Sequence, residues 1–211
     1  MMRYCLFVAL LAALPALGQS SEQLFNGKNL DGWKFQSGEP GLVGFAVDGG
    51  VLHTQPGKGV LWYTRRKLGN ETLHVVYKMS NEKGNSGVFI RIPAEPTAES
   101  DAINKGIEVQ IQETGDDYHC TGVLYSMTQA KARPYRPAGE WNTLEITMRG
   151  QRTTVRLNGE LVTDYDGVAP VPPKNGQYEP ERGPRPDSGY IAIQHHGGAE
   201  TLWFKEITLI R

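Results

Sequence analysis

One segment in the middle of the chain alternates aliphatic side chains with polar ones that could do chemistry, Ile107-Glu108-Val109-Gln110-Ile111-Gln112. In an extended strand, successive side chains point to opposite faces, so the aliphatic set would pack and the polar set would face outward. A carboxylate beside amides offers a base next to several hydrogen-bonding groups, which suits a sugar or another polyol. The solvated outer face of an ordinary strand would show the same alternation. We predict a sugar-facing polar surface that includes Glu108 and Gln110.

A second candidate lies near the end of the chain, where two glycines follow Gln194-His195-His196. Alternation places Gln194 and His196 on one face of a strand and His195 on the other. Imidazole titrates near neutral pH, so His196 is the expected acid or base partner of Glu108, with Gln194 as a substrate contact. The ordinary alternatives are a surface histidine at a strand end for His196 and a packed histidine for His195.

Four further residues are expected to contact a substrate: Arg91, Asn85, Tyr125 and Trp62. Arg91 alternates with Phe89 and should project from a polar face, where it would touch the site or pair with Glu108. Asn85 could instead make a turn, and the aromatic side chains could instead pack in a core. If the strands of Arg91, Glu108 and His196 belong to one sheet, these residues converge on a concave polar face.

The first eighteen residues have the pattern of a secretory signal peptide. Arg3 precedes an apolar run, and small residues end it at Gly18. We expect cleavage near Gly18 and export to the periplasm or the extracellular space. No later segment offers the roughly 20 apolar residues of a membrane-spanning helix. Cleavage would remove Cys5 and leave Cys120 as a free, dispensable thiol.

The overall charge is close to zero, with 22 basic and 23 acidic side chains and no basic run longer than Arg65-Arg66-Lys67. Nucleic acid is therefore not an expected partner, whereas a carbohydrate is. The length of residues 19–211 fits one domain. His53, His74 and His119 lack metal-ligand spacing and are expected to be structural or exposed.

Short alternating runs with scattered Gly and Pro predict an all-β fold, with strands at 42–47, 51–54, 60–63, 72–79, 87–92, 106–112, 122–125, 141–149, 153–157, 160–165, 189–195 and 202–210. So many strands favour two stacked antiparallel sheets, a jelly-roll sandwich of the concanavalin A-like type. Two long excursions, 93–105 and 168–187, interrupt the pattern. The second holds six of the thirteen prolines. It is either disordered surface or a loop that frames a cleft, and Tyr178, Arg182 and Arg185 favour the cleft.

Several segments in a specific order resemble one family of secreted bacterial proteins associated with 3-keto-disaccharide hydrolysis. They are LFNGKNLDGW (24–33), GNSGVFIR (84–91), GIEVQI (106–111), TGVLY (121–125), GEWN (139–142), LNG (157–159), GYIAIQHH (189–196) and WF (203–204). The resemblance implies a concanavalin A-like jelly roll. It also implies cleavage of glycosides already oxidised to a ketone at C3 of the sugar, by hydrolysis or by elimination followed by hydration.

Such a substrate sets clear requirements for the site. A ketone at C3 acidifies the C2 hydrogen, so a base can remove it and the enolate can expel the C1 substituent. The site needs a base near C2, a cation or hydrogen-bond donor near the C3 oxygen, and a donor to the leaving oxygen. Glu108 is the expected base. A divalent metal on His196 and Glu108 could polarise the keto oxygen, and the sequence neither requires nor excludes it.

Two alternatives remain open from the sequence. The spacing of Glu108, Gln110 and Glu113 is similar to the active-site strand of jelly-roll β-glucanases, in which two glutamates act as a retaining pair. Glu113 is an odd number of positions from Glu108, so the two would reach one face only through a bulge. The other alternative is a non-catalytic carbohydrate-binding module, since lectin-like jelly rolls bind sugars with amides and aromatic rings.

Overall fold

The structure is a computed structural model that describes residues 20–39 and 41–211. The predicted signal peptide, residues 1–18, lies outside the described residues. Within the described part of the chain, no helix is long and apolar enough to cross a membrane.

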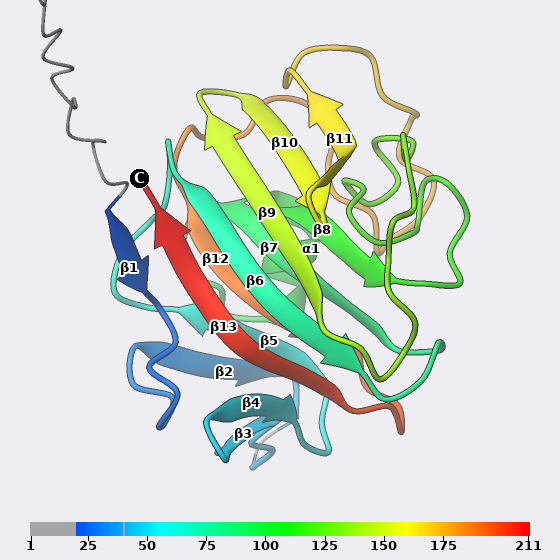
Figure 1. Ribbon diagram of the computed structural model, residues 1–211. Coiled ribbons are helices and arrows are strands. Elements are labelled where there is room, and N and C mark those ends of the chain that lie inside the picture. The colour runs from blue at the N-terminus through cyan, green and yellow to red at the C-terminus, as the bar shows by residue number, and fades with distance from the viewer. Residues whose placement is uncertain (1–19, 40) are drawn as a thin grey trace, which may run out of the picture.

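Eight antiparallel strands form the larger sheet: β1 (Ser21–Gln23), β3 (Phe45–Asp48), β4 (Val51–Thr54), β6 (Thr72–Met79), β9 (Asn142–Arg149), β10 (Arg152–Leu157), β11 (Glu160–Tyr165) and β13 (Leu202–Ile210). Their order is β11-β10-β9-β6-β13-β4-β3, and β1 pairs with β13. This sheet is the front layer of Figure 1. Asn158 and Gly159 both have positive φ in the turn between β10 and β11, as the Asn-Gly hairpin signal predicts.

Five antiparallel strands form the smaller sheet: β2 (Trp33–Ser37), β5 (Gly59–Tyr63), β7 (Asn85–Ile92), β8 (Ile107–Gln112) and β12 (Tyr190–His195). Their order is β2-β5-β12-β7-β8. The strands that carry Glu108 and Gln194 therefore belong to one sheet, and β7 lies between them.

A continuous apolar core fills the space between the sheets. On β8, Ile107, Val109 and Ile111 point into this core, as their alternation predicts. Burial of such side chains is the main stabilising contribution to a sandwich of this kind. The prediction of a jelly-roll sandwich of two antiparallel sheets is confirmed. Cys120 lies in the same core, and its thiol is free, as expected.

A short helix, α1 (Glu99–Lys105), was not expected from the sequence. It lies in the excursion 93–105 and packs its buried residues Ala102 and Ile103 on the outer face of the smaller sheet. Asp101 accepts hydrogen bonds from the backbone N–H groups of Thr97 and Ala98 at 2.9 and 3.3 Å, which fixes the start of the helix. Seven residues are too few for a helical period to stand out.

Most predicted strands are present, and four of them, 51–54, 72–79, 160–165 and 202–210, have the predicted bounds. The strand predicted at 122–125 is instead a turn with one isolated bridge between Leu124 and Val109. Gly122 has φ +90° there, which interrupts an extended backbone. Strands β1 and β2 were missed because both are short and lie near sheet edges, where alternation is weak.

The proline-rich excursion is fastened to the sandwich by arginines. Arg182 donates to the carbonyls of Pro172 and Pro180 and to Ser126 Oγ, and it pairs with Glu179 at 2.8 Å. Arg182 therefore holds the excursion in place, and Arg185 does the same, because its guanidinium donates to backbone carbonyls including that of Gly106. Backbone carbonyls outnumber other acceptors in a loop rich in proline, so guanidinium groups bind them.

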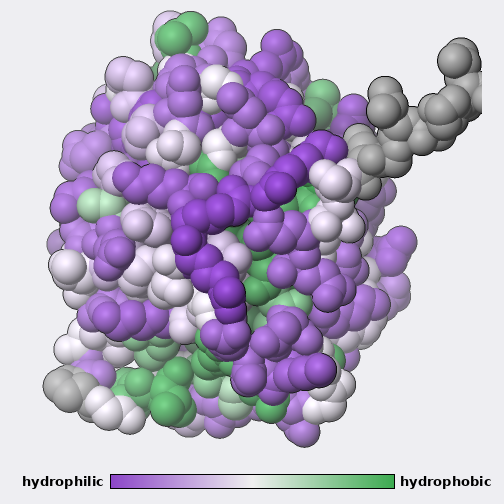
Figure 2. All heavy atoms as spheres, turned by 90° about the vertical axis from the view of Figure 1, so that its left-hand side faces the viewer, coloured by the Kyte–Doolittle hydropathy of each residue, from purple (hydrophilic) through white to green (hydrophobic). Residues whose placement is uncertain are grey.

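The outer surface is mostly hydrophilic. Figure 2 shows the side of the molecule at the left of Figure 1, where apolar side chains gather mainly along the lower edge. Among the described residues, the large apolar side chains that are exposed are Val43, Tyr135, Val168 and Tyr178.

Candidate active site

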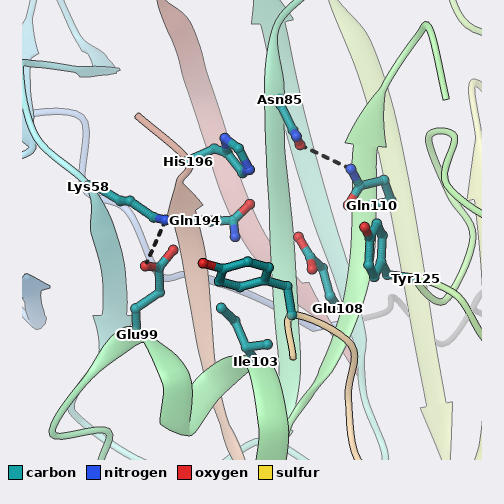
Figure 3. A pocket seen from close by; sticks show the side chains of 10 residues that line it. Lys58, Asn85, Glu99, Ile103, Glu108, Gln110, Tyr125, Gln194 and His196 are labelled. Atoms are coloured by element: carbon teal, nitrogen blue, oxygen red, sulfur yellow. Dashed lines mark hydrogen bonds and ion pairs between the residues drawn. The ribbon is translucent and has the colours of Figure 1, made fainter. Parts of the chain in front are cut away.

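A pocket of about 300 Å³ opens on the outer face of the smaller sheet, beside α1. Ten residues line it: Lys58, Asn85, Glu99, Ile103, Glu108, Gln110, Tyr125, Tyr178, Gln194 and His196 (Figure 3). They come from four neighbouring strands or their ends, β5, β12, β7 and β8, from α1, and from the segments that hold Tyr125 and Tyr178. The volume is at the lower end of the range for small-molecule sites.

Strand register explains how the floor of the pocket forms. Glu108 of β8 lies opposite Phe89 of β7, and Gln110 lies opposite Gly87. Because β8 alternates, both polar side chains project from the face opposite the apolar core. Gln194 projects from the same face of β12, opposite Val60. The convergence of Glu108, Gln110 and Gln194 follows from alternation together with this strand order.

Gly87 gives the Glu108 side chain its position. A Cβ at residue 87 would overlap the Glu108 carboxylate and lie 2.6 Å from its Cγ. Real Cβ atoms do not approach other atoms so closely, so any larger residue would displace Glu108. The absence of a side chain at position 87 thus lets the carboxylate lie flat across β7.

Gly87→Ala is expected to move the carboxylate and to slow any reaction that depends on it by about 10-fold or more, since a displacement near 1 Å can cost about 10²-fold in rate. Initial rates on the substrate that the sequence resemblance implies, a 3-keto glycoside, measure this. Gly38→Ala is the matched control, because a Cβ at this position meets no other atom within 4 Å. Wild-type rates in Gly87→Ala would show that the Glu108 position is not critical.

The Glu108 carboxylate is buried and forms no hydrogen bond with any side chain or backbone group of the described residues. Burial raises its pKa from 4.5 to about 8, and the nearby carboxylate of Glu99 adds to the increase. A carboxylate with so high a pKa is a much stronger base than an exposed glutamate. This combination of burial and shifted pKa is typical of catalytic groups.

Glu99, the first residue of α1, is a second carboxylate in the pocket that the sequence did not indicate. Its Oε1 is buried without a hydrogen-bond partner, and its Oε2 lies 3.8 Å from Lys58 Nζ. Burial raises the pKa of Glu99, and Lys58 and Gln194 oppose that increase. Glu99, Lys58 and Ile103 line the pocket although the sequence did not indicate them, because nothing local marks a short helix as covering a sheet. Tyr178 lines the pocket as well, in agreement with its expected place beside a cleft.

Two buried amide oxygens in the pocket have no partner. Gln110 donates through Nε2 to Asn85 Oδ1 at 3.0 Å and to Gln112 Oε1 at 3.1 Å, which leaves its own Oε1 unpaired. The Oε1 of Gln194 is also buried and unpaired. Buried polar atoms are normally hydrogen-bonded, so unpaired acceptors in a pocket favour a ligand that donates hydrogen bonds, such as a sugar hydroxyl.

The two histidines at the end of β12 face opposite sides, as alternation predicts. His196 lines the pocket, and burial, with Lys58 and His195 nearby, lowers its pKa below 6.5. His195 packs its ring edge-on against Phe45, 5.7 Å between centroids, and accepts a hydrogen bond from Gly197 N–H. The His196 ring is therefore neutral at pH 7 and retains one N–H donor and one acceptor.

Arg91 does not reach the pocket, contrary to the expectation of one shared face. The pairing of β12 with β7 shifts register between Tyr190 and Ala192, and Arg91 has φ +59°. Ile90 packs in the core between the sheets, whereas Ile92, two positions later, packs on the outer face with α1. A bulge therefore breaks the alternation at Arg91 and turns its side chain away from Glu108.

The buried Arg91 guanidinium instead joins the two sheets at one end of the sandwich. It donates to the Pro186 carbonyl at 3.1 Å and to carbonyls at the turn between β9 and β10, Gly150 at 2.7 Å and Arg152 at 3.2 Å. This arrangement holds the proline-rich excursion against the larger sheet. Arg91 is thus positioned as a structural residue.

The two aromatic residues proposed as substrate contacts differ in position. Tyr125 lines the pocket, and its ring lies 4.8 Å from that of His119. Trp62 lies on the same face of the smaller sheet but packs in the apolar cluster beneath α1, edge-on to Tyr190 at 5.2 Å. Trp62 is therefore not a lining residue, because α1 covers it. The sequence did not indicate this helix.

The β-glucanase-like pair is not formed. Glu113 is buried near the core residue Tyr77, where its charge raises the pKa of that tyrosine, and it does not line the pocket. No bulge brings Glu113 to the face of Glu108, since β8 is paired in regular register with β7. The second carboxylate of the pocket is Glu99.

Protein ligands for a metal are few at this site. In residues 20–39 and 41–211, no three His, Cys, Asp or Glu side chains are grouped closely enough to hold an ion. Glu108 and His196 would supply two ligands, fewer than the three protein ligands of a typical catalytic zinc site.

A concanavalin A-like sandwich with a pocket of amides, carboxylates and aromatic rings on one sheet face defines a carbohydrate-active protein. The chain belongs to the family of 3-keto-alpha-glucoside-1,2-lyase-like domains, whose sequence model matches residues 20–210. No protein of curated function matches the sequence.

Solved structures agree with this assignment. A provisionally assigned glycosyl hydrolase from Parabacteroides distasonis is 25% identical, with a TM-score of 0.70 over 90% of this chain and 98% of that one. A second from the same organism is 22% identical, with a TM-score of 0.70 over 90% and 93%. The carbohydrate-binding module CBM66 from Bacillus subtilis is 14% identical, with a TM-score of 0.56 over 85% and 96%. The latter two show the fold alone.

Proposed function

We propose that the pocket cleaves glycosides whose sugar carries a ketone at C3, and that Glu108 is the base that removes the C2 proton. The observation that carries the proposal is the buried Glu108 carboxylate, without a hydrogen bond and with a pKa near 8, in a pocket lined by unpaired amide oxygens. The family match supports the substrate class.

The proposed reaction begins when the Glu108 carboxylate takes the proton from C2, and the electron pair of the C–H bond forms an enolate with the C3 carbonyl. The enolate then expels the C1 substituent with its bonding electron pair, which leaves a double bond between C1 and C2. Addition of water across that bond gives the free 3-keto sugar. The negative charge on the C3 oxygen needs a nearby donor, and Lys58 and the N–H of His196 line the same pocket.

His196 serves this scheme as a neutral hydrogen-bonding group. Because its pKa is lowered, the imidazolium form is scarce at pH 7 and the ring is a poor source of a proton for the leaving oxygen. Gln110 and Gln194 would accept hydrogen bonds from sugar hydroxyls through their unpaired oxygens. Asn85 orients the Gln110 amide by accepting its N–H.

Incubation of the purified protein with 3-keto glucosides and with their unoxidised parents, with and without a chelator, tests the proposal. We expect cleavage of the keto substrates alone. Cleavage of the parents would indicate an ordinary glycosidase. Binding of either sugar without cleavage would indicate a carbohydrate-binding module, the alternative from a different class.

The rate should depend on pH through Glu108. The base must be ionised to act, and its pKa is about 8, so only about a tenth of it is ionised at pH 7. We expect kcat/KM on an activated substrate, the 4-nitrophenyl 3-keto-glucoside, to increase with pH and level off above about 8. A pH profile measured between 5.5 and 9.5 checks this. A rate that is constant from pH 6 upward would contradict a buried base of high pKa.

A further inference from the structure

The leaving oxygen also needs a proton donor, and the pocket contains a second carboxyl group. Resting on the proposed function, we propose that Glu99 is the general acid that protonates the glycosidic oxygen as it leaves. Figure 3 shows Glu99 extending from α1 and Glu108 from β8, with both carboxyl groups directed into the same pocket.

Glu99 lies at the side of the pocket, closer to its opening than Glu108, where the leaving group of a bound glycoside would pass. Glu108 projects from a strand in the floor of the pocket and is 5% exposed, whereas the Glu99 side chain is 17% exposed and belongs to the helix at its side. Its neighbour Lys58 is half exposed and lies over the ring of the exposed Tyr178, 5.5 Å from the centroid. The oxidised sugar would occupy the floor over Glu108, and its C1 substituent would extend outward past Glu99.

The two oxygens of Glu99 have different surroundings. Oε2 faces Lys58 at 3.8 Å, which holds the side chain in place. Oε1 is buried and has no partner that meets hydrogen-bond geometry among the described residues, and the Gln194 amide lies near the carboxyl group and favours its ionised form. A ligand oxygen at this position would receive the proton of Oε1. Burial favours that protonated form, because it raises the pKa of the group.

Other lining residues are less suited to this role. Lys58 is half exposed and is paired with Glu99. His196 is neutral because its pKa is lowered, and the pKa of the Tyr125 hydroxyl is raised by burial and by Glu108, which makes it a weaker acid. Tyr178 is exposed at the rim, where an aromatic ring can stack on the departing sugar or aglycone.

The complete step balances in protons and electrons. Glu108 gains the C2 proton, the C–H electron pair becomes the C1–C2 double bond through the enolate, and the C1–O electron pair remains on the leaving oxygen. That oxygen takes the proton from Glu99 Oε1. Two carboxyl groups in one pocket titrate as a pair. After the pair has lost its first proton and before it loses the second, the two groups share one proton. The reacting form carries this proton on Glu99 and the negative charge on Glu108. It is the less populated distribution, because the high pKa of Glu108 and the contact of Glu99 with Lys58 favour the reverse, and exchange with water restores it after each turnover.

Glu99→Gln, assayed with two leaving groups, tests the proposal. The leaving group of a 3-keto disaccharide is the second sugar, a poorly acidic alcohol that needs protonation as it departs. The leaving group of the 4-nitrophenyl substrate, 4-nitrophenolate, is a stable anion that does not need it. We expect kcat/KM to decrease by about 10²-fold on the disaccharide and by less than about 3-fold on the 4-nitrophenyl 3-keto-glucoside. Glu95→Gln, an exposed glutamate in the same excursion, is the matched control and should leave both rates unchanged. Glu99→Asp should recover part of the disaccharide activity.

The outcomes separate this role from others. Equal losses on both substrates would show that Glu99 only positions other groups or maintains the fold, and unchanged rates on both would show that it has no role. Thermal unfolding of each variant identifies a folding defect. If Glu99→Gln has such a defect, the ratio of kcat/KM on the disaccharide to kcat/KM on the 4-nitrophenyl substrate is compared between Glu99→Asp and the wild type. A purely structural defect leaves this ratio at the wild-type value, whereas loss of the general acid lowers it. If wild-type protein cleaves neither substrate, the proposed function itself is wrong.

Discussion

Glu108→Gln should lower kcat/KM on a 3-keto glycoside by about 10²–10⁴-fold, the usual contribution of a general base. The amide keeps the shape of the carboxylate but cannot accept the C2 proton. Unlike Glu99→Gln, this variant should lose activity on the 4-nitrophenyl substrate as well, because proton removal precedes loss of any leaving group. Initial rates on both substrates measure the effect.

The same variant should become more stable than the wild type at alkaline pH. The folded pKa of Glu108, about 8, lies above its ordinary value of 4.5, so folding favours the protonated carboxyl. Wild-type stability therefore decreases as pH rises from about 4.5 to about 8 and then levels off, by an amount on the order of a few kcal/mol. Glutamine does not titrate, so the variant does not lose stability through this group as pH rises. Thermal unfolding at pH 5 and pH 9 provides the comparison.

A matched control is Glu160→Gln, at an exposed position that begins β11, for which both activity and stability should be unchanged. Retention of wild-type turnover by Glu108→Gln would remove Glu108 as the base. Loss of activity together with lower stability at pH 9 would instead indicate a structural role for its charge.

Arg91→Met should destabilise the fold by about 3 kcal/mol, because hydrogen bonds from a charged group contribute roughly 1.5–3 kcal/mol each and burial of methionine recovers part of that. The guanidinium donates to the carbonyl of Pro186 in the proline-rich excursion and to those of Gly150 and Arg152 at the turn between β9 and β10. For a chain of this length, such a change lowers the melting temperature by about 6–12 °C. Calorimetry or circular dichroism at pH 7 measures the shift.

Arg156→Met is the control for this prediction. Arg156 is exposed on β10 and donates one hydrogen bond, to the Gly159 carbonyl at 3.0 Å, so its loss should cost less than about 1 kcal/mol. If Arg91→Met unfolds at the wild-type temperature but loses substrate affinity, Arg91 contacts the substrate after all, as alternation alone suggested.

The sequence by itself determined the sandwich, because burial of alternating aliphatic side chains on extended segments leaves few other arrangements. It also determined which side of β8 carries Glu108 and Gln110, and that His196 and His195 face apart. These are consequences of local geometry: an extended chain turns each successive side chain by half a turn, whatever lies around it. The order of the family segments further indicated the family, which the sequence model over residues 20–210 confirms.

Tertiary structure decided the rest of the pocket. A bulge sets Arg91 apart from the alternation of its strand, and it depends on how β12 pairs with β7, about one hundred positions away in the chain. The short helix α1 brings Glu99 over the sheet and covers Trp62, although its residues show no helical period. Burial by these distant segments also sets the pKa of Glu108. Such contacts join residues far apart in sequence, so the local pattern contains no record of them, and the meeting of Glu99 and Glu108 in one pocket becomes visible only in the folded chain.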